Sequence, residues 1–276
     1  MPEKDKKLNI GIAGCGAIGS SLADSIVYDF SKEAQLLALY DVDAQKAYSL
    51  STKLNRKLAI SSLDELINKV DLVIEATKAG TAFDIARKAL SNSRDIMIMS
   101  VGGILEHYNE LKALAQSKGA RVFIPSGAIC GIDGVKAAVA SGKVNKVILT
   151  TRKPPEAFSG VAYILQNNIR LDNIEKDTVI FEGNALQATK AFPQNINVAA
   201  TLSISGIGPE ATIVRIVASP GIDRNIHQIE VDSEAGKITA ITENVIHPDN
   251  PKTSYLAVLS AIATLKQILE PVKIGT

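Results

Sequence analysis

Cysteine, tryptophan and histidine are scarce in this chain of 276 residues, which contains two cysteines, no tryptophan and three histidines. The two cysteines, Cys15 and Cys130, cannot build a disulfide framework and form no metal-ligand cluster. Such sparse cysteine usage suits a reducing compartment. We therefore expect neither structural disulfides nor a metal centre.

An excess of charge of either sign is also missing, as are long apolar runs. Thirty basic and 29 acidic side chains leave a formal net charge of +1, so no overall field would attract nucleic acid or an anionic membrane. No apolar run approaches the roughly 18 residues that would span a bilayer, and residues 1–7 are too polar for a signal peptide. We expect a soluble, cytoplasmic protein with no nucleic-acid or membrane partner.

The most informative segment is Leu8-Asn-Ile-Gly-Ile-Ala-Gly-Cys-Gly-Ala-Ile-Gly19, an apolar run that enters a G-x-G-x-x-G turn and then a helical pattern. Gly14 permits a tight turn, Gly16 lets the backbone approach a pyrophosphate, and Gly19 lets the helix pack closely on the strand. Amides at the start of the helix would face the phosphate. The segment predicts a dinucleotide site.

A second apolar run, 36–40, ends in Asp41, which lies 22 positions beyond Gly19, close to the roughly 20 expected for the acidic residue that holds an adenosine ribose. A carboxylate there accepts hydrogen bonds from both ribose hydroxyls and would repel a 2′-phosphate, so we expect NAD as the preferred cofactor. NADP stays possible, because Lys46 or Arg56 could receive the phosphate. A glycine turn that only packs a helix on a strand is the structural alternative.

The first part of the chain alternates short apolar runs with helical periods, which is typical of a parallel sheet wrapped by crossover helices. Strands are expected at 8–13, 36–40, 57–60, 71–75, 95–100 and 121–124, and Ser62 to Glu65 has the pattern of a capping box. Open α/β sheets bind ligands beyond the carboxyl ends of their strands, so the loops at Ala76 and Gly102 should face the cofactor. We predict a Rossmann dinucleotide-binding domain over residues 1–125. Its expected cofactor-binding residues are Gly14, Gly16, Ala17, Ile18, Gly19, Asp41, Ala76 and Gly102.

After Pro125 the rhythm changes to longer β-rich segments, which indicates a second domain over residues 126–251. Strands at 146–152, 178–183, 211–218, 225–232 and 237–245, with helices at 184–192 and 195–204, favour an α+β substrate or catalytic domain built on a mixed sheet. A last helix, running from about Lys252 to Leu269 within residues 252–276, has a broadly apolar face that includes Tyr255 and Leu259 and would pack back on the first domain. The fold class is therefore α/β, with an α+β second domain.

Four segments outside the glycine turn carry a resemblance to a known family. They are Pro125-Ser-Gly-Ala-Ile-Cys-Gly-Ile-Asp133, Phe192-Pro-Gln-Asn-Ile-Asn-Val-Ala-Ala-Thr201, Asn225-Ile-His-Gln-Ile-Glu-Val231 and Glu243-Asn-Val-Ile-His-Pro-Asp-Asn-Pro-Lys-Thr-Ser254. With them the chain resembles the L-aspartate dehydrogenases over its whole length, whereas other dinucleotide dehydrogenases share only the first domain. The resemblance implies oxidative deamination of L-aspartate with NAD or NADP, through iminoaspartate, to oxaloacetate and ammonia. It also implies that the iminoaspartate can feed quinolinate and hence NAD synthesis.

The resemblance further implies that His227 is the catalytic histidine and that Ala128 and Asn197 contact the cofactor. On a strand over 225–231, side-chain alternation places His227 on a largely apolar face, where a purely structural histidine is the alternative. Deamination needs a base of near-neutral pKa, first to take a proton from the ammonium and then to activate water, and histidine fits that demand. His107, at an expected helix start, and His247, in an expected loop, are weaker candidates, although His247 could line the substrate pocket.

A dicarboxylate substrate requires cationic or amide donors in the second domain. Lys252 is the first candidate, and Thr253 could add a hydroxyl donor at the expected start of the last helix. Asn195 and Asn197 offer amides near the start of another helix. For all four residues a structural role, as a solvated lysine or a helix cap, is the alternative.

Other functions fit the sequence less well. Glutamate and leucine dehydrogenases place the substrate domain first, and the chain lacks the His-His pair followed by a basic residue of dihydrodipicolinate reductase. Homoserine and diaminopimelate dehydrogenase relatives are further alternatives. A cofactor-binding sensor without turnover is an alternative of a different class, since fold does not determine function. A homodimer is expected as the commonest closed assembly.

Overall fold

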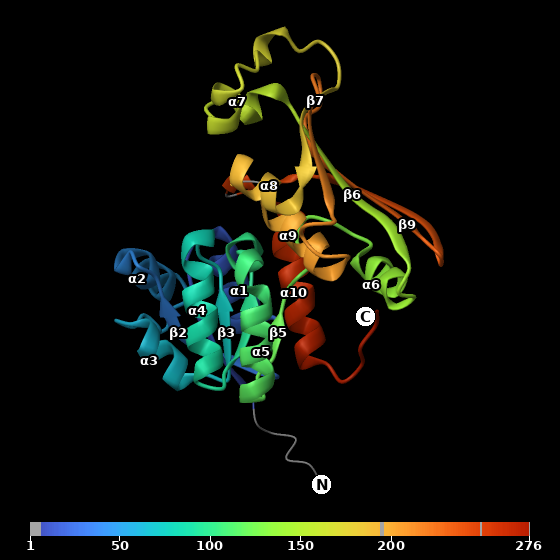
Figure 1. The fold of residues 1–276 in the computed structure, drawn as a ribbon. Helices are drawn as coiled ribbons and strands as arrows, with labels where there is room; N and C mark the ends of the chain where they lie inside the picture. The colour runs from blue at the N-terminus through green and yellow to red at the C-terminus, as the bar shows by residue number, and fades with distance from the viewer. Residues whose placement is uncertain (1–6, 194–195, 249, 276) are drawn as a thin grey trace. The chain divides into compact units, whose positions relative to one another are not determined.

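The computed structural model describes residues 7–193, 196–248 and 250–275, which form two compact units (Figure 1). The first unit contains the chain up to Pro125 together with Val258–Ile274, and the second contains Ser126–Ala257. Each unit has its own hydrophobic core. Among the helices described, none is long and apolar enough to cross a membrane.

The first unit is built on a five-stranded sheet in the order β2-β1-β3-β4-β5, in which neighbouring strands are parallel. The strands are β1 (Leu8–Ala13), β2 (Ala34–Tyr40), β3 (Leu72–Glu75), β4 (Asp95–Ile98) and β5 (Val122–Phe123). The helices are α1 (Ala17–Tyr28), α2 (Ala44–Lys53), α3 (Leu63–Lys69), α4 (Ala79–Ser91), the 3-10 helix η1 (Val101–His107) and α5 (Tyr108–Lys118). This Rossmann-like arrangement confirms the α/β fold predicted for the N-terminal half.

Apolar runs in the central strands explain why this sheet forms. Ile10 and Ile12 of β1 and Ile74 of β3 have no exposed surface. A strand of a parallel sheet is covered by helices on both faces, so it needs apolar side chains at successive positions rather than at alternate ones. The carboxyl ends of these strands then lie along one edge of the sheet, where the loops carry the predicted cofactor residues.

The strand predicted at 57–60 is wrong. Ala59 forms only an isolated bridge to Leu39 of β2. This pairing ends where the next helix begins. Ser62 caps α3 by accepting a hydrogen bond from the amide of Glu65 at 3.2 Å. The reciprocal half of the predicted capping box is displaced by one residue, since the carboxylate of Glu65 accepts from the amide of Ser61 at 3.3 Å.

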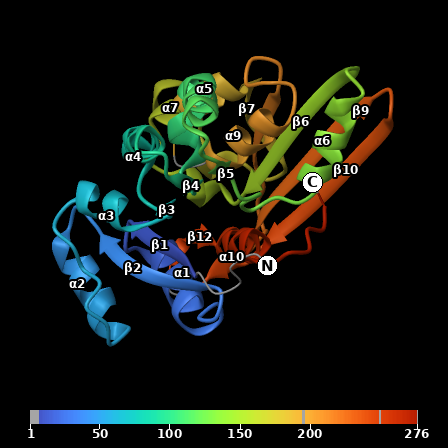
Figure 2. The ribbon, with the colours of Figure 1, turned by 90° about the horizontal axis from the view of Figure 1, so that it is seen from below.

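The second unit is built on a mixed five-stranded sheet in the order β10-β9-β6-β8-β7. Figure 2 shows β6, β9 and β10 side by side. The strands are β6 (Val144–Lys153), β7 (Thr178–Asn184), β8 (Ile213–Ala218), β9 (Asn225–Ser233) and β10 (Gly236–Asn244). β6 and β8 are parallel, and the other neighbours are antiparallel. The helices are α6 (Ile132–Ala140), η2 (Pro155–Phe158), α7 (Ala162–Gln166), η3 (Leu171–Asn173), α8 (Ala185–Ala191) and α9 (Ile196–Ser205). The mixed sheet confirms the predicted fold class of this half.

One face of the mixed sheet carries the core of the second unit. Leu149 of β6 and Ile229 of β9 are paired in register and lie in this core, together with residues of α6, α8 and α9. Because side chains alternate along a strand, the next odd-numbered residues of β6 and β9 lie on the same covered face. This alternation places Thr151 and His227 there.

The last helix begins three residues later than predicted. Asn250–Ser254 form strand β12, which pairs antiparallel with β11 (Ile246–His247), and α10 runs from Tyr255 to Leu269. The predicted apolar face is wrong at two positions, because Tyr255 and Leu259 are 40% and 42% exposed. The residues that α10 buries are Val258, Ala261 and Leu265. The last two of these lie in the core of the first unit.

Candidate functional sites in the two units

Close backbone contacts explain two of the three glycines in the turn after β1. Gly14 has a φ of 101°, and a Cβ there would lie 2.3 Å from the carbonyl oxygen of Ala76. A Cβ on Gly19 would lie 1.9 Å from the carbonyl oxygen of Gly14. At Gly16, by contrast, a Cβ would meet no atom of the described residues within 4 Å. Gly14 and Gly19 therefore serve the fold, whereas Gly16 faces open space.

The open space at Gly16 lies at the N-terminus of α1. Gly16 is the N-cap of this helix, and within the described part of the chain no side chain caps it. The first amides of an α-helix have no acceptor within the helix, so those of Ala17, Ile18 and Gly19 are suited, with the helix dipole, to bind a phosphate group. The turn fits the pyrophosphate of a dinucleotide.

Asp41 follows β2 directly, and its carboxylate holds the glycine turn. Oδ2 accepts a hydrogen bond from the amide of Cys15 at 2.8 Å, and Oδ1 accepts one from the amide of Asp43 at 2.9 Å. Each carboxylate oxygen can accept a further hydrogen bond, so this structural role is compatible with ribose binding. Burial, and then the charge of Asp41, raise the pKa of the Cys15 thiol to about 12, which keeps the thiol protonated.

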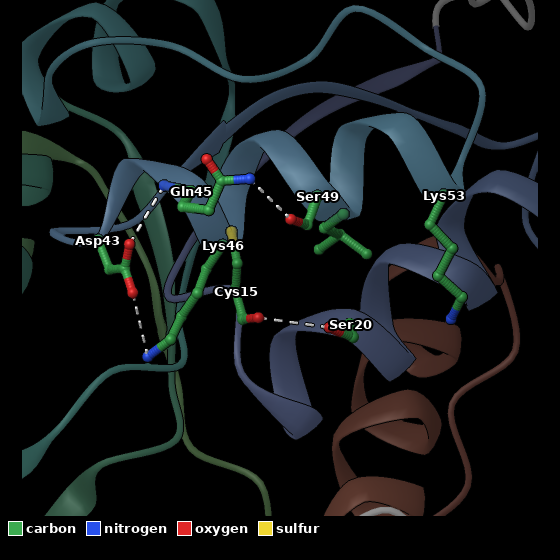
Figure 3. A pocket seen from close by; sticks show the side chains of 8 residues that line it. Cys15, Ser20, Asp43, Gln45, Lys46, Ser49 and Lys53 are labelled. Carbon is green, nitrogen blue, oxygen red and sulfur yellow. Dashed lines mark hydrogen bonds and ion pairs between the residues drawn. The ribbon is translucent and has the colours of Figure 1, made fainter.

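A pocket of about 310 Å³ opens beside this turn, between α1 and α2 (Figure 3). Lys46 lines it, with its side chain running toward Asp43 at 4.0 Å, while Lys53 pairs with Asp24 at 2.8 Å. Arg56 is exposed and does not line the pocket. Of the two cations considered for a 2′-phosphate, Lys46 is the one beside the turn. The lining residues are Cys15, Ser20, Asp43, Gln45, Lys46, Ser49, Leu50 and Lys53.

A buried carboxylate, which the sequence did not single out, positions the loops at the ends of β3 and β4. Glu75 has no exposed surface, and its Oε1 accepts hydrogen bonds from the amide and the hydroxyl of Thr77 at 2.7 and 2.6 Å. Its Oε2 accepts from the amide of Ser100 at 2.9 Å. The two loops that carry Ala76 and Gly102 are thus joined through one side chain.

In the second unit, the central feature is a hydrogen-bonded pair on the covered face of the sheet. His227 of β9 is paired in register with Thr151 of β6, and its Nδ1 lies 3.0 Å from the Thr151 hydroxyl. Burial, and then the positive charge of Lys153, lower the pKa of His227 from 6.5 to about 3. The ring is therefore neutral near pH 7. When Nδ1 carries the proton and donates it to Thr151, Nε2 presents a lone pair.

Polar residues at the end of β10 fix the segment that contains Ala128. The carbonyl oxygen of Ala128 accepts hydrogen bonds from Thr242 Oγ1 at 2.9 Å and from Asn244 Nδ2 at 3.0 Å. Asn244 is in turn held by Ser254, whose hydroxyl donates to Oδ1 at 2.7 Å. The alternation of β10 could have indicated Thr242 and Asn244, because both share a face with His227 through the register of the sheet.

Only some of the residues expected to bind the substrate lie within the described part of the chain. Thr253 is half-buried in β12 rather than at the start of a helix, because the helix begins at Tyr255. Asn197 is exposed in the first turn of α9. Asn195 lies outside the described residues, and so does the side chain of Lys252.

The other two histidines make aromatic contacts. His247 is buried, and its ring lies against Tyr255 with 5.5 Å between the ring centroids. The expectation of a loop position is wrong for His247, because it ends strand β11. His107 stacks on Phe83 with 4.1 Å between the centroids, as a histidine with a packing role would.

Comparisons with known protein families match the two halves of the chain separately. A family model described as the NAD-binding domain of homoserine dehydrogenase matches residues 14–125, and one described as the C-terminal domain of aspartate dehydrogenase matches residues 133–268. The first implies an NAD(P)-type dinucleotide for the N-terminal unit. The second covers the unit that contains His227.

Relatives match over the full length. The chain is 46% identical to an L-aspartate dehydrogenase of Methanosarcina mazei and 38% identical to one of Methanocaldococcus jannaschii, in each case over 98% of this chain and 100% of the relative. A crystal structure of an aspartate dehydrogenase from Thermotoga maritima has the same fold, with a TM-score of 0.71 at 24% identity, and covers 98% of this chain and 100% of that chain.

A pair of glycine variants tests the glycine turn. Gly19→Ala should lower the free energy of unfolding by more than about 2 kcal/mol, because its methyl group overlaps the Gly14 carbonyl. Gly16→Ala should cost less than about 1 kcal/mol, the expected difference between N-cap residues, yet weaken NADH binding at least tenfold by filling the open space. Chemical denaturation and NADH fluorescence titration measure the two effects. Normal NADH affinity in Gly16→Ala would contradict the site.

The buried histidine predicts a loss of stability in acid. The pKa of His227 is about 3 in the folded protein and returns to 6.5 on unfolding, so below pH 6.5 the unfolded state binds more protons and stability falls as the pH falls. Relative to His227→Asn, which does not titrate, the unfolding free energy of the wild type should drop by about 2 kcal/mol between pH 7 and pH 5. Urea denaturation followed by circular dichroism measures this difference. Parallel curves for the two proteins would rule out a buried neutral histidine.

Proposed function

The chain belongs to the L-aspartate dehydrogenase family, and on that premise we propose that it converts L-aspartate, through iminoaspartate, to oxaloacetate and ammonia with NAD or NADP. The observation that carries the proposal is the buried His227–Thr151 pair within the unit that matches the aspartate dehydrogenase model. The reaction is reversible, and its iminoaspartate is a precursor suited to quinolinate synthesis.

The cofactor, when bound, supplies the hydride acceptor. We propose that the amides at the start of α1 bind its pyrophosphate, that Gly16 leaves room for it, and that Asp41 accepts hydrogen bonds from the adenosine ribose. The negative charge of Asp41 favours NAD over NADP. Lys46, in the pocket beside the turn, is the group that would moderate this preference. The remaining proposed contacts are Ala76, Gly102, Ala128 and Asn197.

His227 acts as the general base in this proposal. Its Nε2 takes a proton from the substrate ammonium, which frees the nitrogen lone pair to assist departure of hydride from Cα. His227 then releases this proton to solvent, which restores the neutral ring. In the second half of the reaction Nε2 takes a proton from water as the oxygen adds to the imine carbon, and it returns that proton to the nitrogen, which departs as ammonia when the carbinolamine collapses to oxaloacetate. A neutral ring at physiological pH suits the first of these steps.

Thr151 supports His227 by orienting its ring. The hydrogen bond between Nδ1 and the Thr151 hydroxyl fixes the ring, and in the tautomer in which Nδ1–H donates to that hydroxyl, Nε2 is left to act on the substrate. Lys252, Thr253 and Asn195 remain proposed ligands of the substrate carboxylates. A homodimer in the cytoplasm remains the proposed state of the protein, and size-exclusion chromatography with light scattering would measure the assembly.

The reaction is tested by following NADH at 340 nm with L-aspartate and NAD, beside L-glutamate, L-alanine and L-homoserine. Aspartate-specific reduction is expected, whereas NADH binding without turnover would favour a sensor. His227→Ala should reduce kcat by about two to four orders of magnitude while NADH affinity stays within twofold, because only the base is lost. His107→Ala is the matched control and should retain activity. A mild effect of His227→Ala would refute its role.

Cofactor preference tests Asp41. Asp41→Asn keeps the shape of the side chain and removes its charge, so the ratio of kcat/KM for NAD to that for NADP should fall at least tenfold, which corresponds to about 1.4 kcal/mol. Steady-state kinetics with both cofactors measure the ratio. An unchanged preference, with thermal stability preserved, would mean that the ribose is held elsewhere.

A further inference from the structure

A lysine at the end of β6 lies close to the proposed base. Lys153 follows Thr151 by two residues, so the two side chains project from the same face of the strand. Thr151 is the register partner and hydrogen-bond partner of His227. The lysine, the threonine and the histidine therefore form a row on the covered face of the mixed sheet, where the core gives way to polar residues.

The positive charge of Lys153 acts electrostatically on His227. This charge contributes, after burial, to the lowered pKa of His227. The residues paired with His227 on the two flanking strands are Thr151 and Thr242, and both are uncharged. Burial also lowers the pKa of Lys153 itself. A ligand that carries negative charge stabilises the charged form of a partly desolvated cation.

Arg152, the neighbouring cation of β6, lies on the other face of the sheet from His227. Arg152 projects from the opposite face, where its guanidinium donates to Gln228 at 3.1 Å and lies 3.5 Å from the carboxylate of Asp177. Lys146 projects from that opposite face as well, near the other end of the strand, and is exposed. Position 153 is thus where β6 presents a positive charge toward the histidine.

We propose that Lys153 binds a carboxylate of the substrate and so positions the reacting carbon beside His227. The inference rests on the proposed function and adds a substrate ligand from β6 to those predicted from sequence. Charge-assisted hydrogen bonds between an ammonium and a carboxylate are among the stronger polar contacts, and partial burial strengthens them further.

This placement links substrate binding to the strength of the base. A carboxylate on Lys153 offsets the positive charge that acts on the ring, so the pKa of His227 rises when the substrate binds. A dicarboxylate thereby strengthens the base that it requires. A neutral amino acid, which lacks the second carboxylate, provides less of this effect.

Kinetics of Lys153→Met test the proposal, with Lys146→Met on the opposite face of the same strand as the matched control. KM for L-aspartate should rise about 100-fold in Lys153→Met, an effect typical of losing a partly buried charge pair, while NADH affinity stays within twofold. Lys153→Arg, which keeps the charge, should recover part of the loss. Lys146→Met should behave as the wild type. A wild-type KM in Lys153→Met, or an equal loss in Lys146→Met, would overturn the proposal.

The reverse reaction identifies which carboxylate is bound. With ammonia and NADH, oxaloacetate carries both carboxylates and pyruvate only the one next to the keto carbon. If Lys153 binds the distal carboxylate, Lys153→Met should impair oxaloacetate reduction and leave the rate with pyruvate unchanged. If it binds the proximal one, both should fall to a similar extent. Both results support carboxylate binding, whereas unchanged rates with both substrates would contradict it.

Histidine NMR supplies a test that does not need turnover, and Lys153→Met serves as its control. The chain has three histidines, so the ring signals of His227 can be assigned by substitution. Saturating malonate should raise the pKa of His227 in the wild type by at least one unit, while a neutral analogue should not. An unchanged pKa with bound malonate would refute the proposal. Failure of wild-type turnover with L-aspartate would instead contradict the proposed reaction. The two failures can be told apart, since malonate binding is measured without turnover.

Discussion

The register between β6 and β9 is the constraint on which the chemistry of the second unit depends. Pairing of residue 151 with residue 227 places a hydroxyl against Nδ1 of the histidine, and alternation along β6 brings Lys153 to the same face. A slip of β9 by one residue would move His227 to the opposite face and separate it from Thr151 and Lys153. The apolar pair Leu149 and Ile229 opposes such a slip, because the side chain of Ile229 would then leave the core.

Carboxylates organise the other unit in a comparable way. Asp41, directly after β2, and Glu75, the last residue of β3, accept hydrogen bonds from amides of the glycine turn and of the loops at the carboxyl edge of the sheet, so that hydrogen bonds within the protein hold these loops in shape. Prior organisation of this kind reduces the entropy lost on binding. The proposed ribose contact of Asp41 would therefore add to its structural role, and its charge, not its hydrogen bonds to the backbone, is the property that would discriminate between NAD and NADP.

Local patterns in the sequence predicted the alternating strands, the glycine turn and the mixed sheet, because these depend on periodicity and on backbone sterics. The predicted strand at 57–60 was wrong, because this apolar run forms a single bridge. The predicted start of the last helix was wrong, because residues 250–254 pair with β11 as a strand. The roles of Glu75 and Lys153 were not predicted. Their significance arises from what the register and the loops bring beside them, which no spacing along the chain encodes.

Burial gives His227 a definite protonation state at the expense of base strength. A ring with a pKa of about 3 is neutral across the physiological range, but it holds a proton weakly, and a general base is most effective when its pKa lies near the working pH. In the proposed complex, L-aspartate brings two carboxylates and one ammonium, a net negative charge that offsets the positive charge of Lys153 beside the ring. The relevant base strength therefore belongs to the complex with substrate. The pKa that governs kcat should exceed the one that governs kcat/KM, because the former reports the complex and the latter the free protein.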